Sequence, residues 1–151
     1  MLARTRRTGF TLVEILIVVI ILGILAAIVI PQFTNASQDA RESSLLSQLQ
    51  TLRSQIELYK LQHHDALPDL VTSWDPMTTK TNAAGGAPAA NDTFGPYMQA
   101  APTNPVNTLS NVVNGTAASA TDCGFIYDYA AGLGTGRIWG TDTGKKAIFV
   151  E

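Results

Sequence analysis

The chain has 151 residues, of which 10 are Lys or Arg and 12 are Asp or Glu, so its formal net charge is −2 at pH 7. This length allows one modest domain in addition to any membrane segment. The absence of a basic excess argues against a general nucleic-acid binder, and no nucleic-acid partner is predicted. A single cysteine, Cys123, excludes an intrachain disulfide.

An uninterrupted apolar run from Ile15 to Ile30 dominates the N-terminal part of the chain. Counted from Phe10, a helix over this segment would extend roughly 31 Å, about the thickness of the hydrocarbon core of a bilayer. A secretory signal peptide is the alternative, but its apolar centre is only about 7 to 15 residues long. Arg4, Arg6 and Arg7 precede the run, which predicts a cytoplasmic N-terminal end and an outward-facing remainder.

Glu14 lies near the start of this apolar segment, where an ionised carboxylate is costly unless it has a partner. The sequence holds no Lys, Arg or His between Arg7 and Arg41. Cleavage between Gly9 and Phe10 would create a free α-amine four residues before Glu14. This amine could pair with its own carboxylate or with that of a neighbouring chain, and the second arrangement would favour assembly in a helical bundle.

The stretch "TGFTLVEILIVVIILGILAAIVIPQF", residues 8–33, resembles the N-terminal signature of type IV prepilins and of the pseudopilins of type II secretion. The resemblance implies that residues 1–9 are a leader, that a dedicated prepilin peptidase cuts between Gly9 and Phe10, and that Phe10 is then N-methylated. It also implies that Glu14 directs filament assembly and that Pro31 bends the helix. The implied partners are further copies of the chain in a helical filament, an inner-membrane assembly platform, and the membrane before assembly.

After residues 10–33, the transmembrane and assembly helix, the pattern becomes amphipathic over residues 34–64. Apolar side chains recur at spacings of four and three, which defines one helical face: Leu45, Leu49, Leu52, Ile56 and Tyr59. We expect the helix to end near His64, because Leu67 precedes a proline. His63 and His64 are adjacent and diverge on a helix, which favours a structural role over a metal site.

Residues 65–122 are rich in Ala, Thr, Asn, Gly and Pro and are predicted to form loops, held in place by Trp74, Met77, Phe94, Tyr97 and Met98. Residues 123–151 are predicted to form an antiparallel β-meander of three strands, in "CGFIYDYA", "RIWG" and "AIFV". In the first strand, alternation places Cys123, Phe125, Tyr127 and Tyr129 on one face and Ile126 and Asp128 on the other. The predicted fold is α+β, a long N-terminal helix packed on a small antiparallel sheet, as in pilins.

Catalytic motifs are not apparent, and the chain is not predicted to be an enzyme. The resemblance suggests one cofactor, calcium, with Asp128 and Asp142 as candidate ligands beside Asp122, Thr143 and Gly144. The longer acidic, glycine-rich loop of the major pseudopilins is not recognisable, and a plain turn is the favoured interpretation of "TDTG". No other cofactor is predicted.

Three functions are compatible with the sequence. The first is a type II secretion pseudopilin of a short periplasmic filament that helps move proteins across the outer membrane. The second is a type IV pilin of an extracellular fibre for adhesion, motility or DNA uptake, and the third is a membrane-tethered binding domain that does not polymerise. The lack of a C-terminal cysteine pair and the stretches "IELYKLQHHDALPDL" and "FGPYMQAAPTNPVN" favour the first, with most similarity to the major, G-type pseudopilin.

Overall fold

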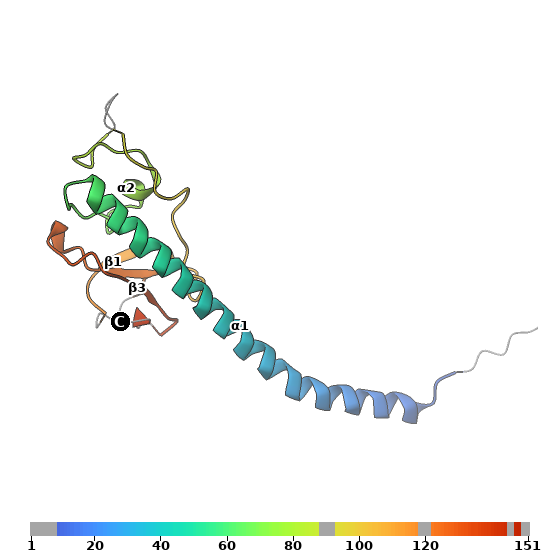
Figure 1. The fold of residues 1–151 in the computed structure, drawn as a ribbon. Helices are drawn as coiled ribbons and strands as arrows, with labels where there is room; N and C mark the ends of the chain where they lie inside the picture. Colours follow the sequence, from blue (N-terminus) through green and yellow to red (C-terminus); the bar gives the residue numbers. More distant parts are fainter. Residues whose placement is uncertain (1–8, 88–92, 118–121, 145–146, 149–151) are drawn as a thin grey trace, which may run out of the picture. The chain divides into compact units, whose positions relative to one another are not determined.

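The computed structural model of the chain contains one long helix, one short helix and one small sheet (Figure 1). It describes residues 9–87, 93–117, 122–144 and 147–148. The helices are α1 (Leu12–Gln62) and α2 (Asp75–Thr78), and a 3-10 turn, η1, covers Ala130–Gly132. The strands are β1 (Val112–Asn114), β2 (Phe125–Tyr127), β3 (Ile138–Thr141) and β4 (Ala147–Ile148). The predicted α+β fold is confirmed.

The chain divides into two compact units at the boundary between Asp39 and Ala40. We call the first the N-terminal unit and the second the head. Helix α1 runs through the boundary. In the N-terminal unit, every described side chain is exposed.

The core of the head forms on the predicted face of α1. Leu45, Leu49, Leu52 and Ile56 are fully buried and Tyr59 nearly so. They cluster with one face of the sheet, namely with Phe125, Tyr127 and Ile138. Burying each such apolar side chain contributes on the order of 1.5–3 kcal/mol. The amphipathic half of α1 is therefore tied to the sheet by the hydrophobic effect.

Close contact between helix and sheet depends on Gly140 in β3. A Cβ atom at this position would lie 2.6 Å from Cδ2 of Leu45. A side chain at this position would force the side chain of Leu45 or the strand to shift, so glycine lets the two elements approach closely.

The end of α1 is set by two residues with left-handed backbone conformations. His64 and Asp65 have φ values of 54° and 65°, and the backbone N–H of Asp65 donates to the carbonyl of Lys60 at 2.9 Å. This bond satisfies one of the carbonyls that a helix end leaves without an intrahelical partner. The helix ends at Gln62, two residues before the expected end.

The sheet has the strand order β1-β2-β3-β4. Strands β2, β3 and β4 are antiparallel neighbours, as predicted. Strand β1 is parallel to β2, with Val112 opposite Phe125, so the sheet is mixed and the prediction of a purely antiparallel sheet is wrong. The prediction missed β1 because its three residues lie in a polar stretch and give no alternation to recognise. A parallel partner also needs a crossover connection instead of a hairpin.

The alternation predicted for β2 is wrong at Cys123. Phe125 and Tyr127 face α1, with Tyr129 packed against the same cluster. Cys123 instead clusters with Ile126 and Trp139 on the opposite face. The reason is local: Gly124 and Phe125 both donate their backbone N–H to the carbonyl of Asn111, which interrupts the regular alternation between Cys123 and Phe125.

Most of the predicted loop anchors pack on the core. Met77 is buried, and Trp74, Tyr97 and Met98 are partly buried against the same cluster. Phe94 contacts the ring of His63 edge-on instead, with the centroids 5.6 Å apart. The backbone N–H groups of Tyr97 and Met98 both donate to the carbonyl of Met77, which fixes this excursion near α2.

Candidate functional site

The start of α1 is a reciprocal capping arrangement between Thr11 and Glu14. Oε2 of Glu14 accepts hydrogen bonds from the backbone N–H of Thr11 at 2.8 Å and from its hydroxyl at 2.9 Å. In return, the backbone N–H of Glu14 donates to Oγ1 of Thr11 at 3.2 Å. This is a capping box, which satisfies backbone donors that a helix start leaves without partners. The negative charge also lies at the positive end of the helix dipole.

The sequence interpretation missed these bonds, because it considered only a cationic partner for the Glu14 carboxylate: the Phe10 amine of the same chain or of a neighbouring one. The signal was present in the spacing T-x-x-E over residues 11–14, which is typical of a capping box. The hydrogen bonds reduce the cost of placing the carboxylate near lipid, but Thr11 supplies no positive charge. A cationic partner would therefore still gain from pairing with Glu14.

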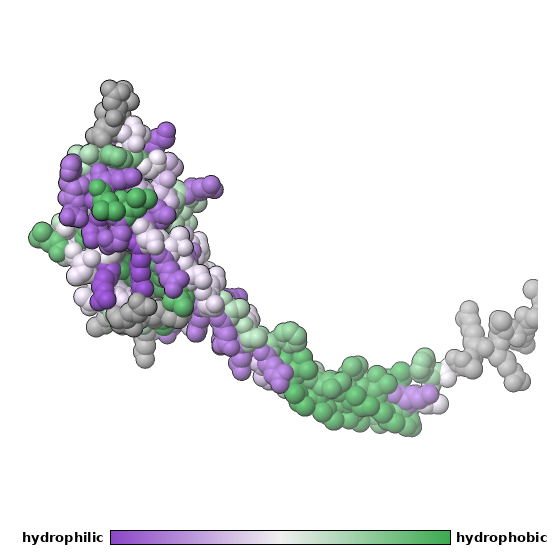
Figure 2. Space-filling view, viewed as in Figure 1, coloured by the Kyte–Doolittle hydropathy of each residue, from purple (hydrophilic) through white to green (hydrophobic). Residues whose placement is uncertain are grey.

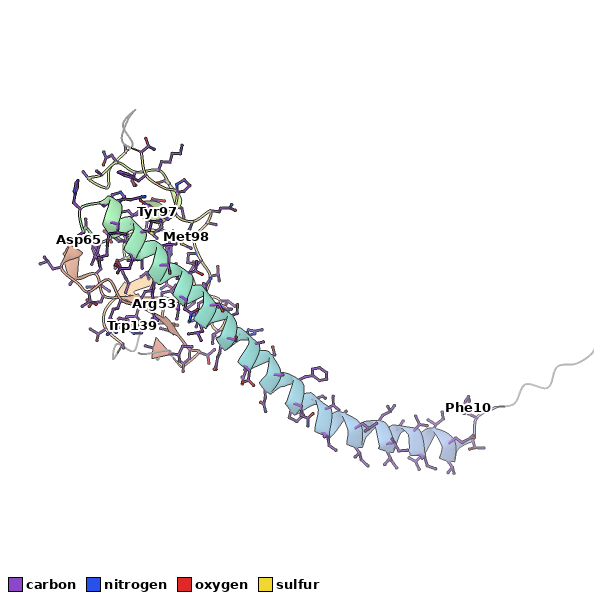
Figure 3. All side chains as sticks on the ribbon, in the orientation of Figure 1. Phe10, Arg53, Asp65, Tyr97, Met98 and Trp139 are labelled. Atoms are coloured by element: carbon purple, nitrogen blue, oxygen red, sulfur yellow. The ribbon has the colours of Figure 1, made fainter. Side chains whose placement is uncertain are left out.

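The predicted cleavage bond between Gly9 and Phe10 lies just before the helix, in a stretch without regular structure. Phe10 is 82% exposed, and Figure 3 shows it ahead of the first turn of α1. Apart from the chain neighbours of Gly9, no atom of the described residues lies within 4 Å of the position where a Cβ of Gly9 would be. None of the described residues covers this bond, and residues 1–8 of the predicted leader lie outside the described residues. Cleavage here and methylation of Phe10 stay predictions.

Large apolar side chains cover the N-terminal unit from Leu12 to Phe33, each at least 41% exposed. Figure 2 shows this as a continuous hydrophobic surface along the N-terminal half of α1. Among the described residues, α1 is the one helix long and apolar enough to cross a membrane. A surface of this kind is unstable in water and requires lipid or other protein chains to cover it.

Pro31 lies inside α1, which continues through it without interruption. Proline has no backbone N–H, so the carbonyl of Ala27 loses its usual helical partner. One turn further on, the hydroxyl of Thr34 donates to the carbonyl of Ile30 at 3.1 Å. The bend expected at Pro31 stays a prediction.

His63 has the structural role that the sequence favoured. It is buried, its ring stacks on Tyr59 with centroids 3.7 Å apart, and Nδ1 lies 2.9 Å from the carbonyl oxygen of Tyr59. Nε2 lies 2.9 Å from Oγ1 of Thr81. Because His64 is exposed, the two histidines do not share a site.

Of the candidate calcium ligands, Asp128 already accepts hydrogen bonds within the chain. Oδ2 of Asp128 accepts hydrogen bonds from the backbone N–H of Thr135 at 3.1 Å and from its hydroxyl at 2.6 Å. These bonds hold the pKa of the Asp128 carboxyl below its usual value. Within the described ranges, no group of three or more His, Cys, Asp or Glu side chains is arranged to hold a metal ion. Calcium binding at Asp128 and Asp142 stays a prediction.

The N-terminal region of the chain matches a known protein family. Residues 4–30 match the family described as the prokaryotic N-terminal methylation motif. The type II secretion system core protein G of Aeromonas hydrophila is 30% identical over 102 residues, which cover 68% of this chain and 69% of that protein. The proteins of the same name from Dickeya chrysanthemi and Pseudomonas aeruginosa are 40% identical over 58 residues and 38% identical over 60. No solved structure matches the chain.

These alignments differ in extent. The chain spans about two thirds of the Aeromonas protein, but only 38% and 42% of the Dickeya and Pseudomonas proteins. The shorter alignments carry the higher identity.

An exposed apolar helix that begins with a methylation motif, followed by a small α+β head, defines a subunit of the pilin class. Within that class, the similarity to the Aeromonas protein extends well into the head. The chain belongs to the type II secretion system core protein G family, whose members are pseudopilins.

Proposed function

We propose that the chain is the repeating structural subunit of a pseudopilus, a filament that helps move proteins across the outer membrane. The observation that carries this proposal is the exposed apolar surface of α1 from Leu12 to Phe33. Lipid covers this surface before assembly, and the same segments of other copies cover it afterwards. The role is structural and not catalytic.

Maturation prepares the contact between copies. A prepilin peptidase removes residues 1–9, and the new α-amine of Phe10 is methylated and keeps its positive charge. In the filament, this amine lies beside the Glu14 carboxylate of a neighbouring copy, away from water, where an ion pair is much stronger than in bulk solvent. The capping box supports the proposal, because its bonds to Thr11 fix the carboxylate at the helix start.

The location follows from the same segment. Before assembly, α1 crosses the inner membrane once, with the arginines of residues 4–7 on the cytoplasmic side and the head in the periplasm. An inner-membrane assembly platform then takes up the subunit. The growing filament occupies the periplasm.

The test is a deletion of the gene in its own host, complemented by the wild-type chain or by Glu14→Gln. Secreted proteins are measured in the culture medium, and sheared cells that overproduce the chain are imaged for fibres. Loss of secretion that only the wild-type chain restores would support the proposal. Intact secretion in the deletion strain, together with surface fibres on the overproducing cells, would overturn the proposal in favour of an extracellular pilin. Intact secretion without any filament would overturn it in favour of a membrane-tethered domain that does not polymerise.

A further inference from the structure

Three large apolar side chains are exposed among the described residues of the head, namely Leu58, Leu61 and Leu133. Leu133 is 91% exposed and lies in the loop that joins β2 to β3. Figure 2, viewed as Figure 1, shows one hydrophobic patch over the end of α1 and another at the loop of η1, with hydrophilic surface between them. The head therefore presents two separate apolar spots to its surroundings.

The loop that carries Leu133 is held in shape by hydrogen bonds. Oδ1 of Asn114 accepts bonds from the backbone N–H groups of Tyr129 and Ala130, each at 3.1 Å. The backbone N–H of Leu133 itself donates to the carbonyl of Ala130 at 3.1 Å. The carbonyl of Tyr129 accepts further bonds from two glycines of the loop. These contacts fix the position from which the Leu133 side chain projects.

The backbone of this loop is strained next to Leu133. Three successive residues, Ala130, Ala131 and Gly132, have left-handed conformations with φ values of 42°, 54° and 89°. Glycine adopts this region readily, but alanine avoids it. Backbone strain of this kind persists only where the surrounding structure enforces it, and it clusters at functional sites. A function in presenting Leu133 accounts for the strain.

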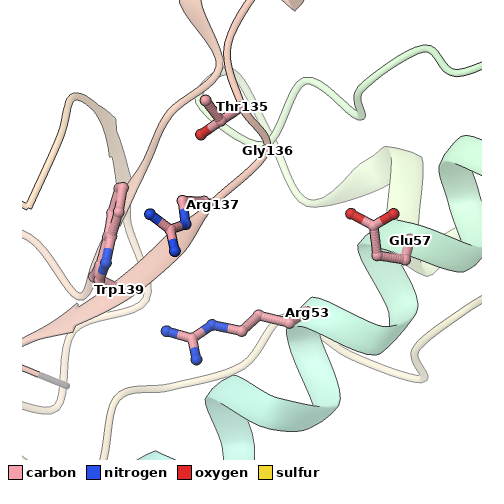
Figure 4. A pocket seen from close by; sticks show the side chains of 6 residues that line it. All are labelled: Arg53, Glu57, Thr135, Gly136, Arg137 and Trp139. Atoms are coloured by element: carbon pink, nitrogen blue, oxygen red, sulfur yellow. The ribbon is translucent and has the colours of Figure 1, made fainter. Parts of the chain in front are cut away.

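A cavity separates the end of the loop from part of α1. Figure 4 shows this space, which has a volume of about 190 Å³. It is lined by Arg53, Glu57, Thr135, Gly136, Arg137 and Trp139. On this side, the shape of the loop is therefore set by its own hydrogen bonds and not by packing on the helix.

The second apolar spot lies on the outer face of α1. Leu58 and Leu61 are three residues apart, so they are neighbours on one face of the helix. Leu61 follows the fully buried Leu52 by two and a half turns, which places it on the side of the helix opposite the core. Strands β2 and β3, which carry the loop, pack on the core side. Leu133 is therefore kept apart from the other two leucines within its own chain.

The small size of the two spots identifies the kind of partner that they suit. Three leucines cover only a small part of the about 1,200–2,000 Å² that a stable and specific interface buries, so they cannot hold a freely diffusing protein by themselves. A partner that is already tethered nearby needs far less contact, because its effective concentration is high. Another copy of the chain, joined through its apolar N-terminal segment in the filament, meets this condition.

We propose that Leu133 of one copy packs between Leu58 and Leu61 of a neighbouring copy in the filament. The inference rests on the proposed function, since the filament is what brings the heads together. The contact joins two different surfaces, so it repeats from copy to copy instead of closing a pair, as an open helical assembly requires. Burial of the leucines stabilises the contact, and the fixed loop loses little conformational freedom when it docks.

Cysteine cross-linking tests the contact in filaments of the full-length chain. Leu61→Cys combined with Leu133→Cys should give a ladder of dimers, trimers and longer products after shearing and mild oxidation, because each copy is joined to the next. Either change alone should give no ladder. Gln50→Cys combined with Leu133→Cys is the matched control, because Gln50 is exposed on α1 but lies about 16 Å before position 61. Peptide mapping by mass spectrometry identifies the joined thiols and excludes the buried Cys123.

The other outcomes are distinct. Equal ladders from both pairs, or filaments of the Leu61 pair that give no ladder, would overturn the contact. Products that stop at dimers joined through position 133 would show a symmetric contact instead, and cross-links from position 133 to a different protein would show that the loop docks a secreted protein or another component. Wild-type cells that form no filament at all would count against the proposed function itself, and the inference would fall with it.

A charge pair tests the same contact without cross-linking. Leu133→Glu and Leu61→Lys should each lower the filament yield about fivefold, since each places a charge against an apolar surface. The combined variant should recover most of the yield, because the opposite charges then meet across the contact. Leu133→Glu with Gln50→Lys is the control and should show no recovery. All of these positions are exposed, so Tm of the head in detergent should be unchanged, and a combined variant no better than the weaker single variant would contradict the pairing.

Discussion

Glu14 and Thr11 exchange hydrogen bonds at the start of α1. The backbone N–H of Thr11 donates to Oε2 of Glu14 at 2.8 Å, and the backbone N–H of Glu14 donates to Oγ1 of Thr11. The carboxylate thus has two separable properties, its capacity to accept hydrogen bonds and its charge. A glutamine keeps the first and loses the second, because its amide oxygen can complete the same capping box. This difference allows the two roles to be measured separately.

The first prediction concerns the charge of Glu14. Glu14→Gln should insert into the membrane and keep the helix start, but it should fail to enter filaments because no ion pair with a neighbouring Phe10 amine can form. Glu14→Leu should insert better than the wild-type chain, since burial of the carboxylate in lipid costs energy, and should also fail to assemble. Filament yield in sheared fractions and chain amount in membranes are the measurements.

Thr11→Ser is the control for this series, because serine keeps the capping hydroxyl, and it should assemble. Normal assembly of Glu14→Gln would show that the charge is not needed and that Glu14 acts through the cap.

The second prediction concerns maturation. Replacing Gly9 by valine adds a branched side chain next to the predicted scissile bond, where the chain itself leaves the Cβ position open. The variant should accumulate in membranes with residues 1–9 still attached, as read by intact mass. A mature mass that begins at any residue other than Phe10 in the wild-type chain would contradict the assigned cleavage site.

The third prediction concerns the contact between helix and sheet. Gly140→Ala should destabilise the head by about 1–3 kcal/mol, because the added methyl group overlaps the side chain of Leu45. Combining it with Leu45→Ala should cost less than the sum of the two single changes, since the smaller side chain makes room for the methyl group. Thermal unfolding measures the three variants. Strict additivity would argue against a direct clash.

The fourth prediction concerns a buried amide that donates hydrogen bonds to two backbone carbonyls. Nδ2 of Asn104 donates to the carbonyls of Gly124 and Thr141, each at 2.8 Å, and its side chain is fully buried. Asn104→Ala leaves both carbonyls without this donor and should cost about 2–4 kcal/mol. Thr103→Ala, at the exposed neighbouring position, should change the free energy of unfolding by no more than about 0.5 kcal/mol. A similar loss for both variants would show that the effect is not due to the amide.

The fifth prediction concerns acid stability. The hydrogen bonds from Thr135 lower the pKa of Asp128 in the folded state, so the ionised carboxylate stabilises the head above the ordinary pKa of about 3.9. This contribution is lost as pH falls through the lowered folded-state value. The Tm difference between wild type and Asp128→Asn should therefore be constant above about pH 5 and shrink in stronger acid. Thr135→Val should reduce the same difference, and a difference that grows in acid would contradict the assigned direction.

The sequence predicted the parts of the fold that depend on periodicity. The face of α1 from Leu45 to Tyr59 is buried as expected, because a stripe at spacings of three and four leaves few alternatives for a helix. The strands in "RIWG" and "AIFV" were also recognisable, although the end of the second lies outside the described residues.

The features that sequence analysis missed depend on single contacts. The parallel strand β1 is only three residues long, and its pairing with β2 comes from tertiary structure. The change of face at Cys123 arises because two successive N–H groups share one carbonyl, that of Asn111. The capping box is an exception, because the spacing T-x-x-E over residues 11–14 already indicates it in the sequence.

Leu45 is the first buried side chain of α1, and every residue of the helix before it is exposed. Transfer of a subunit from the bilayer to a filament would therefore leave the core of the head unchanged. The apolar segment of the helix would exchange all of its surroundings. Any force applied to the head would reach the apolar segment through residues 34–44, where the backbone hydrogen bonds of the helix would carry it.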